Sequence, residues 1–433
     1  MMRRAALLPT LLLTLAFLPG PSAAAPLTPL TPEEQRLKVA LTALVRQEEQ
    51  ALLGGKEQRF LAAFGPGGAK SDAAVRMRER LGLFMAWAEA RGATLRLSDL
   101  TLRTPRIAFA TDDRVSVTAV VSESFRYRYL GEAREQAFGL GVRHYYTLRY
   151  SVDRLQILSD DFTAPARDRG APPRPAPGKS RRSVAPASTA GGKRAAAYAD
   201  RYCGAAPGCG NDGFANPRYA NLNGDGGDCT NFISQVLKAG GLKEDGSWFY
   251  DRATAEGSRA WSNAQGLADH LAWAPWAHRL AGGDYQAIVA PTAAHPNGAD
   301  RALRLGDLVS YVQHGDVVHT GVVTGFDAHG LPLVDAHYND RYHTPWDLGW
   351  GQDARYRLWR IDYPPSLLES ILRRAGRILG GARGPAGAQP GPLGTRAVTS
   401  HLASGIVRRL GAAGSARPNC QGGAQTAAPS YRP

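Results

Sequence analysis

Cys229 is the residue of this sequence whose type and position best suit nucleophilic chemistry. It follows a glycine-rich turn, 221–228, and opens an apolar run at helical spacing that ends at Gly240-Gly241. Asp228 stands at the N-cap position, so Cys229 is predicted to be the first helical residue. A thiol there has a lowered pKa, because unpaired amides and the helix dipole favour the thiolate. The alternative is a small buried residue at a helix start.

A cysteine nucleophile needs a base, and His319 is the predicted one. It opens an apolar strand, and a turn at 327–330 then sends the chain back through residues 331–337. If this hairpin folds about residues 328–329, His319 lies across from about position 338. His337 and Asn339 are then the two candidates to orient the imidazole, and His337 is favoured because it lies within the strand.

The sequence also offers candidates for the groups that would stabilise an oxyanion. The amide of Cys229 is a natural donor at a helix start, and Tyr219 and Asp228 are the side chains assigned to an oxyanion or substrate role. Tyr219 fits a packing role equally well. Asn231 and Gln235 lie near Cys229 on the same helix, where hydrogen bonds to the glycine-rich turn are the favoured interpretation.

Several short motifs then come in a fixed order along the chain: Asn216-Pro217-Arg218-Tyr219, Gly227-Asp228-Cys229-Thr230-Asn231-Phe232-Ile233-Ser234-Gln235, Trp248-Phe249-Tyr250, Trp261-Ser262-Asn263-Ala264, Gly306-Asp307-Leu308-Val309-Ser310-Tyr311 and His319-Thr320-Gly321-Val322-Val323. In this order they resemble the bacterial putative amidase domain family over roughly residues 195–363. The resemblance implies a papain-like fold akin to NlpC-type and CHAP cell-wall peptidases. It also implies a Cys229–His319 dyad with a polar third residue.

Three rival interpretations use the same residues. Cys229, His319 and His337 are ligand types that suit a zinc-dependent amidase. A noncatalytic cell-wall-binding protein is the other alternative, with the aromatic residues of the second domain gripping glycan. The loop from Asn221 resembles the start of a calcium loop, but Phe232 stands where a bidentate Glu is needed. The glycine-rich approach to Cys229 favours nucleophilic attack, with no metal or cofactor.

The chain divides into five segments. Residues 1–25 have the basic start, apolar core and small residues of a secretory signal peptide. Residues 27–162 predict a small α+β domain of two helices and a meander, in an order similar to cone-shaped SnoaL-like folds. A linker rich in Pro and Arg, 163–192, leads to the α+β catalytic domain, 193–363, which is expected to fold without the first domain. Residues 364–433 form a basic low-complexity tail.

The net charge of +14 belongs to two segments. Residues 166–200 carry eight Lys and Arg against two Asp, and residues 364–433 carry nine Arg against one Glu. No aromatic residues interleave with these charges, so no nucleic acid is expected as a partner. An anionic cell-wall or membrane surface remains possible as a contact of the basic tail. The oligomeric state is not indicated.

Four cysteines leave two pairings open. Cys203 and Cys209 can close a short loop, and Cys229 and Cys420 can form the rival bridge, which would abolish the proposed chemistry. Together the patterns predict a secreted or envelope-associated cysteine amidase or peptidase. Its expected substrate is a peptide, with the amide bonds of peptidoglycan stem peptides as the leading candidate.

Overall fold

The computed structural model describes residues 29–56, 63–64, 67–110, 113–151, 154–162, 185–210, 215–222, 228–351, 353–365 and 370. The predicted signal peptide, most of the predicted linker, Cys420 and nearly all of the basic tail lie outside these residues, as do the glycines at 224, 226 and 227. The description below concerns the described residues alone.

The first region begins with two helices that local signals specify well. Helix α1 (Pro32–Leu53) starts with a capping box between Thr31 and Glu34 and with Pro at the first helical position. A short 3₁₀ turn, η1 (Gly68–Lys70), precedes α3 (Asp72–Ala90), whose first amides are capped by Ser71. These are the two helices predicted for the start of the first domain.

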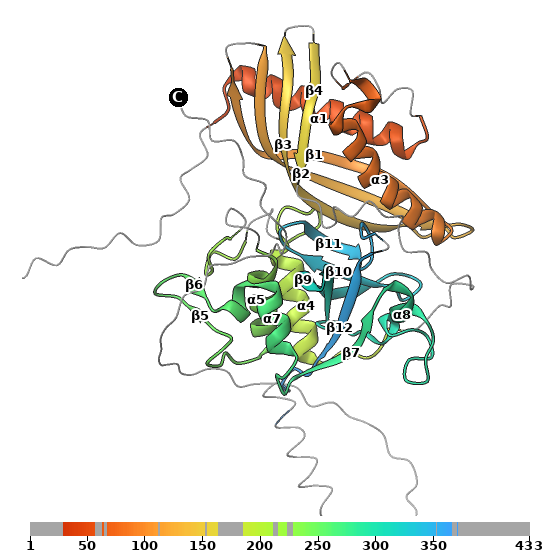
Figure 1. Cartoon of the computed structure of the whole chain (residues 1–433), viewed down its shortest axis with the longest axis vertical. Helices are drawn as coiled ribbons and strands as arrows, with labels where there is room; N and C mark the ends of the chain where they lie inside the picture. Colours follow the sequence, from red (N-terminus) through yellow and green to blue (C-terminus); the bar gives the residue numbers. More distant parts are fainter. Residues whose placement is uncertain are drawn as a thin grey trace, which may run out of the picture.

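Four long antiparallel strands accompany these helices: β1 (Ala93–Phe109), β2 (Arg114–Tyr129), β3 (Gln136–Ser151) and β4 (Arg154–Phe162). They pair in the order β1-β2-β3-β4, and α1 and α3 lie along them (Figure 1). Phe125, Tyr127 and Tyr129 are buried while Arg126 and Arg128 between them are exposed, the alternation of a strand with one buried face. The four consecutive antiparallel strands form the predicted meander.

The second region adds more helices and a second set of strands. Its elements are α4 (Ala190–Tyr202), α5 (Cys229–Gly240), β5 (Tyr250–Asp251), β6 (Glu256–Gly257), α6 (Arg259–Ser262), α7 (Ala264–Leu271), β7 (Ala277–Gly283), α8 (Tyr285–Val289), η2 (Asp300–Ala302), β8 (Leu308–Gln313), β9 (Asp316–Phe326), β10 (Pro332–Ala336), β11 (Asp340–Pro345) and β12 (Arg355–Ile361). Strands β7 to β12 are antiparallel in the order β11-β10-β9-β8-β12-β7. Helices α4, α5 and α7 gather on one side of them (Figure 1). Helix α4 starts three residues before the predicted boundary at 193, because Thr189 caps it.

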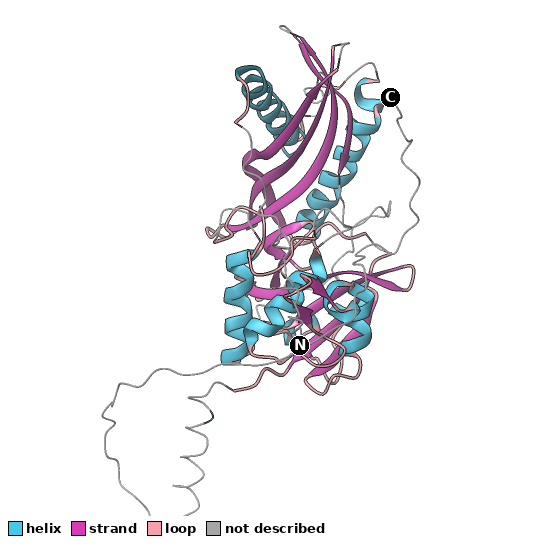
Figure 2. Cartoon of the chain, turned by 90° about the vertical axis from the view of Figure 1, so that its left-hand side faces the viewer, coloured by secondary structure: helices cyan, strands magenta, loops and turns pink. Residues whose placement is uncertain are grey.

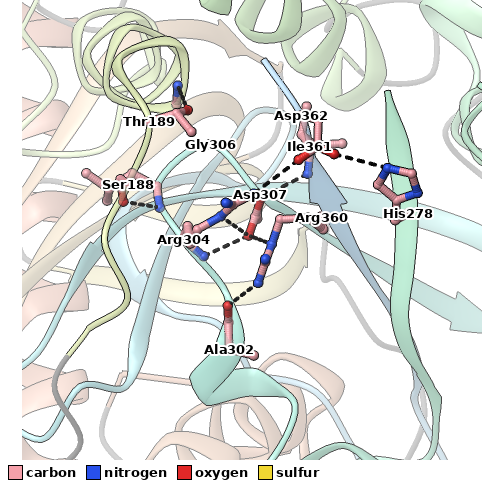
Figure 3. Close-up of polar contacts among 12 residues, drawn as sticks. Ser188, Thr189, His278, Ala302, Arg304, Gly306, Asp307, Arg360, Ile361 and Asp362 are labelled. Atoms are coloured by element: carbon pink, nitrogen blue, oxygen red, sulfur yellow. Dashed lines mark hydrogen bonds and ion pairs between the residues drawn. The ribbon is translucent and has the colours of Figure 1, made fainter. Parts of the chain in front are cut away.

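One network fixes the start of β8 to the end of β12 (Figure 3). The carboxylate of Asp307 accepts hydrogen bonds from the backbone amides of Arg304 and Ile361, at 2.8 and 2.9 Å. It also accepts one from the Nε of Arg360 at 3.0 Å. The Gly306-Asp307 motif is therefore structural, since its carboxylate is fully used in joining these segments.

The two regions share one sheet. Strand β3 pairs with β11 at Gly141↔Asp340, Leu140↔Arg341 and Gly139↔Tyr342, which makes a ten-stranded antiparallel sheet. The long curved strands of the first region, turned by 90° in Figure 2, run down to this junction. The chain is thus α+β, as predicted, with one large antiparallel sheet.

Buried side chains also cross the junction. The indole of Trp87 donates to Asp347 at 2.9 Å, and Arg91 pairs with the same carboxylate. The hydroxyl of Tyr129 hydrogen-bonds the carboxylate of Asp327, and the main hydrophobic core contains residues of both regions. Sheet and core thus continue across the boundary, which argues against the prediction that residues 193–363 fold without the first domain.

Cys203 and Cys209 form a disulfide that closes a loop of sequence separation 6, as one of the two predicted pairings has it. Cys229 is a buried thiol. None of the described helices combines the length and the apolar character needed to cross a membrane.

Candidate active site

Cys229 lies where the sequence predicts, at the first residue of α5. The helix ends at Gly241, whose φ of 110° suits a glycine C-cap. The Cys229 side chain is fully buried in a small apolar cluster made by α7 and the β8–β9 hairpin: Ala264, Ala268, Val312 and Val317. The thiol is therefore at the positive end of a helix and shielded from water, and a substrate must displace part of this shield to reach it.

Asp228, the residue before the thiol, forms a buried ion pair. Its Oδ2 lies 2.7 Å from the Nδ1 of His337, and its Oδ1 accepts from the Asn231 side chain and from the Leu222 amide. The carboxylate makes no side-chain cap bond to α5. Its part is to hold His337 and the segment before the helix.

His337 is held from both sides. Its Nε2 hydrogen-bonds the carbonyl of Tyr202, and its ring stacks on Phe232 of α5 with centroids 4.0 Å apart. A carbonyl and a carboxylate both accept, so both ring nitrogens donate and the ring is an imidazolium. Burial opposes this charge, but the hydrogen bond and the charge of Asp228 outweigh burial and raise the pKa of His337.

His319 lies in a different environment. Its ring is near the rings of Tyr311 and Trp350, at 5.6 and 6.1 Å between centroids, and its Nε2 is buried without a hydrogen-bond partner among the described residues. Burial, with a smaller effect from the Arg341 guanidinium, lowers the pKa of His319 to about 3. The resting imidazole is therefore neutral.

The two histidines lie on opposite sides of the sheet. The pairs of Val334 with Val323 and Asp335 with Val322 agree with the predicted hairpin, but β10 ends at Ala336, so His337 lies in the turn before β11 and not within the strand, where it was predicted. The His337 ring stacks on Phe232, on the side of the sheet that packs with α4 and α5. His319 shares the face of Tyr311.

The role assigned to His337 behind the His319 ring is therefore corrected, because both of its nitrogens are engaged elsewhere. Asn339, the alternative third residue, is buried with an Oδ1 that has no partner within the described part of the chain. It remains the candidate for that role.

Tyr219 packs in an aromatic cluster. Its ring centroid lies 5.0 Å from that of Tyr250 and 5.8 Å from that of Trp261. Its hydroxyl hydrogen-bonds Arg252, and burial raises its pKa. These contacts support the packing interpretation over an oxyanion role.

The other polar residues of the Cys229 motif hold the helix in place. Asn231 donates to the carbonyl of Ala220 at 2.8 Å and accepts from the indole of Trp261 at 2.8 Å. Gln235 accepts from the hydroxyl of Tyr198 at 2.7 Å. Asn231 thus bonds the chain at the glycine-rich turn, as expected, through Ala220 and Asp228, whereas Gln235 bonds α4 and not the turn.

The rival interpretations lose support from this geometry. Trp248 and Trp261 are fully buried in the core, so their rings are not presented to a glycan. Zinc ligation by Cys229, His319 and His337 is disfavoured because the two histidines face opposite ways and the nitrogens of His337 are already bonded. A different set, Asp200, Asp335 and His343, does bring its ligand atoms together.

Sequence reasoning missed several neighbours of the site. The carbonyl of Tyr202 bonds His337, and Arg341 and Trp350 lie near His319. No local pattern marks these residues, because each reaches the site through strand pairing or a long connection. Among these residues, Trp350 lies in a segment rich in Trp and Gly, and this composition was the one sequence signal that could have pointed to it.

Comparison with known proteins bears on the region that contains the candidate site, not on its individual residues. A comparison of the whole sequence with curated proteins gave no match. Residues 190–359, which span α4 to β12, match the family model described as a putative amidase domain, and the match supports an amide-hydrolysing function for this part of the chain.

Proposed function

We propose that this protein is a cysteine amidase whose nucleophile is Cys229. The observation that carries the proposal is the position of the thiol at the first residue of a helix, inside the region that matches the amidase model. The amides and dipole at a helix N terminus favour the thiolate. The Asp228–His337 ion pair beside Cys229 is neutral as a unit, so the helix N terminus is the source of positive potential at the thiol.

The proposed reaction is acyl transfer through a thioester. The Cys229 sulfur attacks the amide carbonyl, and a histidine that has taken the thiol proton gives it to the leaving amine as the C–N bond breaks. Water then attacks the thioester, the same histidine removes its proton, and the carboxylic acid and thiol are released. The backbone amide of Cys229 is the proposed donor to the oxyanion.

His319 is the proposed base. Its imidazole is neutral, and its Nε2 has no partner within the described residues. It stands two residues after Val317, which packs with Cys229, and a bulge in β9 lies between them. Its ring is on the Tyr311 side of the sheet, away from α5, so the proposal requires the ring to turn towards the thiol when substrate binds. Bulges re-aim side chains beside many active sites. A buried imidazole with a low pKa accepts a proton only when the thiolate balances the new charge, so transfer would be coupled to attack.

The proposed substrate is an amide bond of a peptidoglycan stem peptide, with the protein exported to the cell envelope. Support comes from the amidase match and from the signal-like composition of residues 1–25. The Arg-rich segments of the linker and tail would favour contact with an anionic polymer. We also propose the papain-like fold that the resemblance implies for this domain.

Four variants test the proposal on peptidoglycan, with new amino termini as the readout: Cys229→Ala, His319→Gln, Asn339→Ala and His278→Gln. The first two should lower turnover by on the order of a thousandfold or more. Asn339→Ala should have a smaller effect, and His278→Gln, at an exposed ring, should have none. Normal turnover in Cys229→Ala would refute the mechanism. Normal turnover in His319→Gln would instead assign the base to another residue, with His337 the first to examine.

A further inference from the structure

Three polar side chains meet on the α4 side of the sheet, apart from the candidate active site. Asp200 comes from the last turns of α4, Asp335 from β10 and His343 from β11. One ligand atom from each lies within 4.8 Å of the other two. The three residues come from elements far apart in the sequence, so their meeting is a property of the tertiary fold.

Asp335 is the buried member of the group. Its side chain is completely buried, and its Oδ1 accepts from the Thr324 hydroxyl at 2.7 Å and from the His343 amide at 2.8 Å. Its Oδ2 is buried without a hydrogen-bond partner among the described residues. An unsatisfied carboxylate oxygen in a buried site is costly, and the nearby carboxylate of Asp200 adds repulsion.

His343 and Asp200 complete an arrangement that is open on one side. The Nε2 of His343 lies 2.9 Å from an oxygen of Asp200, and their side chains are 28% and 38% exposed. Both can therefore exchange a bound ion with solvent while Asp335 lies beneath them. The backbone of His343 has a φ of 49°, which is unusual for a residue other than glycine and fixes where its ring projects.

We propose that Asp200, Asp335 and His343 bind a zinc ion. One imidazole nitrogen and two carboxylate oxygens are ligands that Zn²⁺ accepts, and three protein ligands leave a fourth position for water. Ca²⁺ and Mg²⁺ prefer sets made of oxygen alone with more ligands, so this set favours a transition metal. The cation gives the orphaned oxygen of Asp335 a partner and offsets the repulsion between the carboxylates.

The ion would have a structural role and not a catalytic one. Asp335 lies two residues before His337, near the end of β10, and His343 follows Tyr342, whose partner in β3 is Gly139. A metal held here ties α4 to β10 and β11, close to the junction of the two regions. Thr324 would be the residue that orients the Asp335 carboxylate.

Calorimetric titration of the metal-free full-length protein with ZnCl₂ tests this proposal. The protein carries Cys229→Ser and Cys420→Ser, so that no cysteine outside the Cys203–Cys209 disulfide can bind the probe. One ion per chain should bind, and His343→Ala and Asp335→Asn should each weaken binding by on the order of 100-fold. His278→Ala is the matched control, because His278 also pairs with an aspartate, Asp362, but lies outside the cluster. It should bind zinc like the parent.

Two further measurements keep the result interpretable. The Co²⁺-loaded protein should show d–d absorption of a nitrogen and oxygen site with no sulfur-to-cobalt band. If Asp335→Asn fails to fold, Asp200→Asn at a partly exposed position takes its place. Absence of saturable binding, or equal affinity in His343→Ala and the parent, would overturn the proposal. Because the readout is binding, it is independent of whether Cys229 is the nucleophile.

Discussion

The imidazole of His337 lies between the carboxylate of Asp228 and the carbonyl of Tyr202, and its folded-state pKa is raised. The charged His337 ring therefore stabilises the folded state fully below its unfolded pKa of about 6.5. This stabilisation is lost as pH rises through the pKa that His337 has in the folded state. We predict that His337→Asn lowers the free energy of unfolding by on the order of 3 kcal/mol at pH 6, because Asp228 is left buried and unpaired. Urea unfolding from pH 6 to 9 should show a weaker loss with rising pH in the variant than in the wild type.

The matched control is His278→Asn, whose ring is 58% exposed and also pairs with an aspartate. It should unfold like the wild type. Equal pH dependence in His337→Asn and the wild type would show that the Asp228–His337 pair does not carry the charge assigned to it.

For His319, the predicted pH dependence of the free energy of unfolding has the opposite sign to that for His337. Its pKa of about 3 in the fold lies below the unfolded value of about 6.5, so its contribution is present above pH 6.5 and is lost as pH falls towards 3. We predict that the wild type loses on the order of 2 kcal/mol between pH 7 and pH 4.5 from this group. His319→Gln should lose less over the same range. Denaturant midpoints at several pH values measure the difference, and parallel curves would contradict the prediction.

At the scale of elements, Asp307 joins the start of β8 to the end of β12 (Figure 3). We predict that Asp307→Ala lowers the free energy of unfolding by about 3 kcal/mol, because Arg360 and two buried amides lose their acceptor. Asp362→Ala removes a carboxylate that is 55% exposed in the same network, and should cost under about 1 kcal/mol. Chemical denaturation of both variants makes the comparison. Similar losses in the two would mean that burial of Asp307 is not what matters.

Elements with strong local signals follow the sequence closely. Helix α1 begins with the Thr31–Glu34 box, α3 spans Asp72–Ala90, and α5 begins at Cys229 and ends before Gly241. Caps and apolar spacing act within a few residues, so the sequence alone contains what is needed to predict them.

Interactions between distant segments are harder to predict. The hairpin of β9 and β10 was predicted, but the position of His337 was not, because β10 ends at Ala336 and His337 lies in the turn before β11. The pairing of β3 with β11 leaves no local pattern. The His343–Asp200 contact likewise requires knowledge of which strands are neighbours.

For the whole molecule, the junction between the regions is the feature that decides stability. The buried carboxylate of Asp347 accepts a hydrogen bond from Trp87 of α3 and forms an ion pair with Arg91, the residue that follows this helix. Asp347 lies in the segment that also carries Trp350. We predict that Arg91→Ala lowers the free energy of unfolding by on the order of 3 to 5 kcal/mol, since it leaves a buried charge without its partner. Thermal and urea unfolding measure the loss.

Arg46→Ala is the control, because Arg46 pairs with Asp99 at the surface, where such pairs contribute up to about 1 kcal/mol. A fragment of residues 185–363 should also fail to give a cooperative unfolding transition, while 29–363 should give one. A stable 185–363 fragment would mean that the second region folds without β3.

The β3–β11 pairing also bears on the order in which the chain can fold. Gly141 and Asp340 pair directly although nearly the whole second region lies between them in the sequence. Closing so long a loop costs conformational entropy before any contact repays it, and high contact order slows folding. The first region has its own helices and four local strands, so it can form while the rest is still being synthesised. The environment of His319, which depends on Arg341 in β11, is therefore completed late, and the chain gains its candidate base only when its two halves have joined.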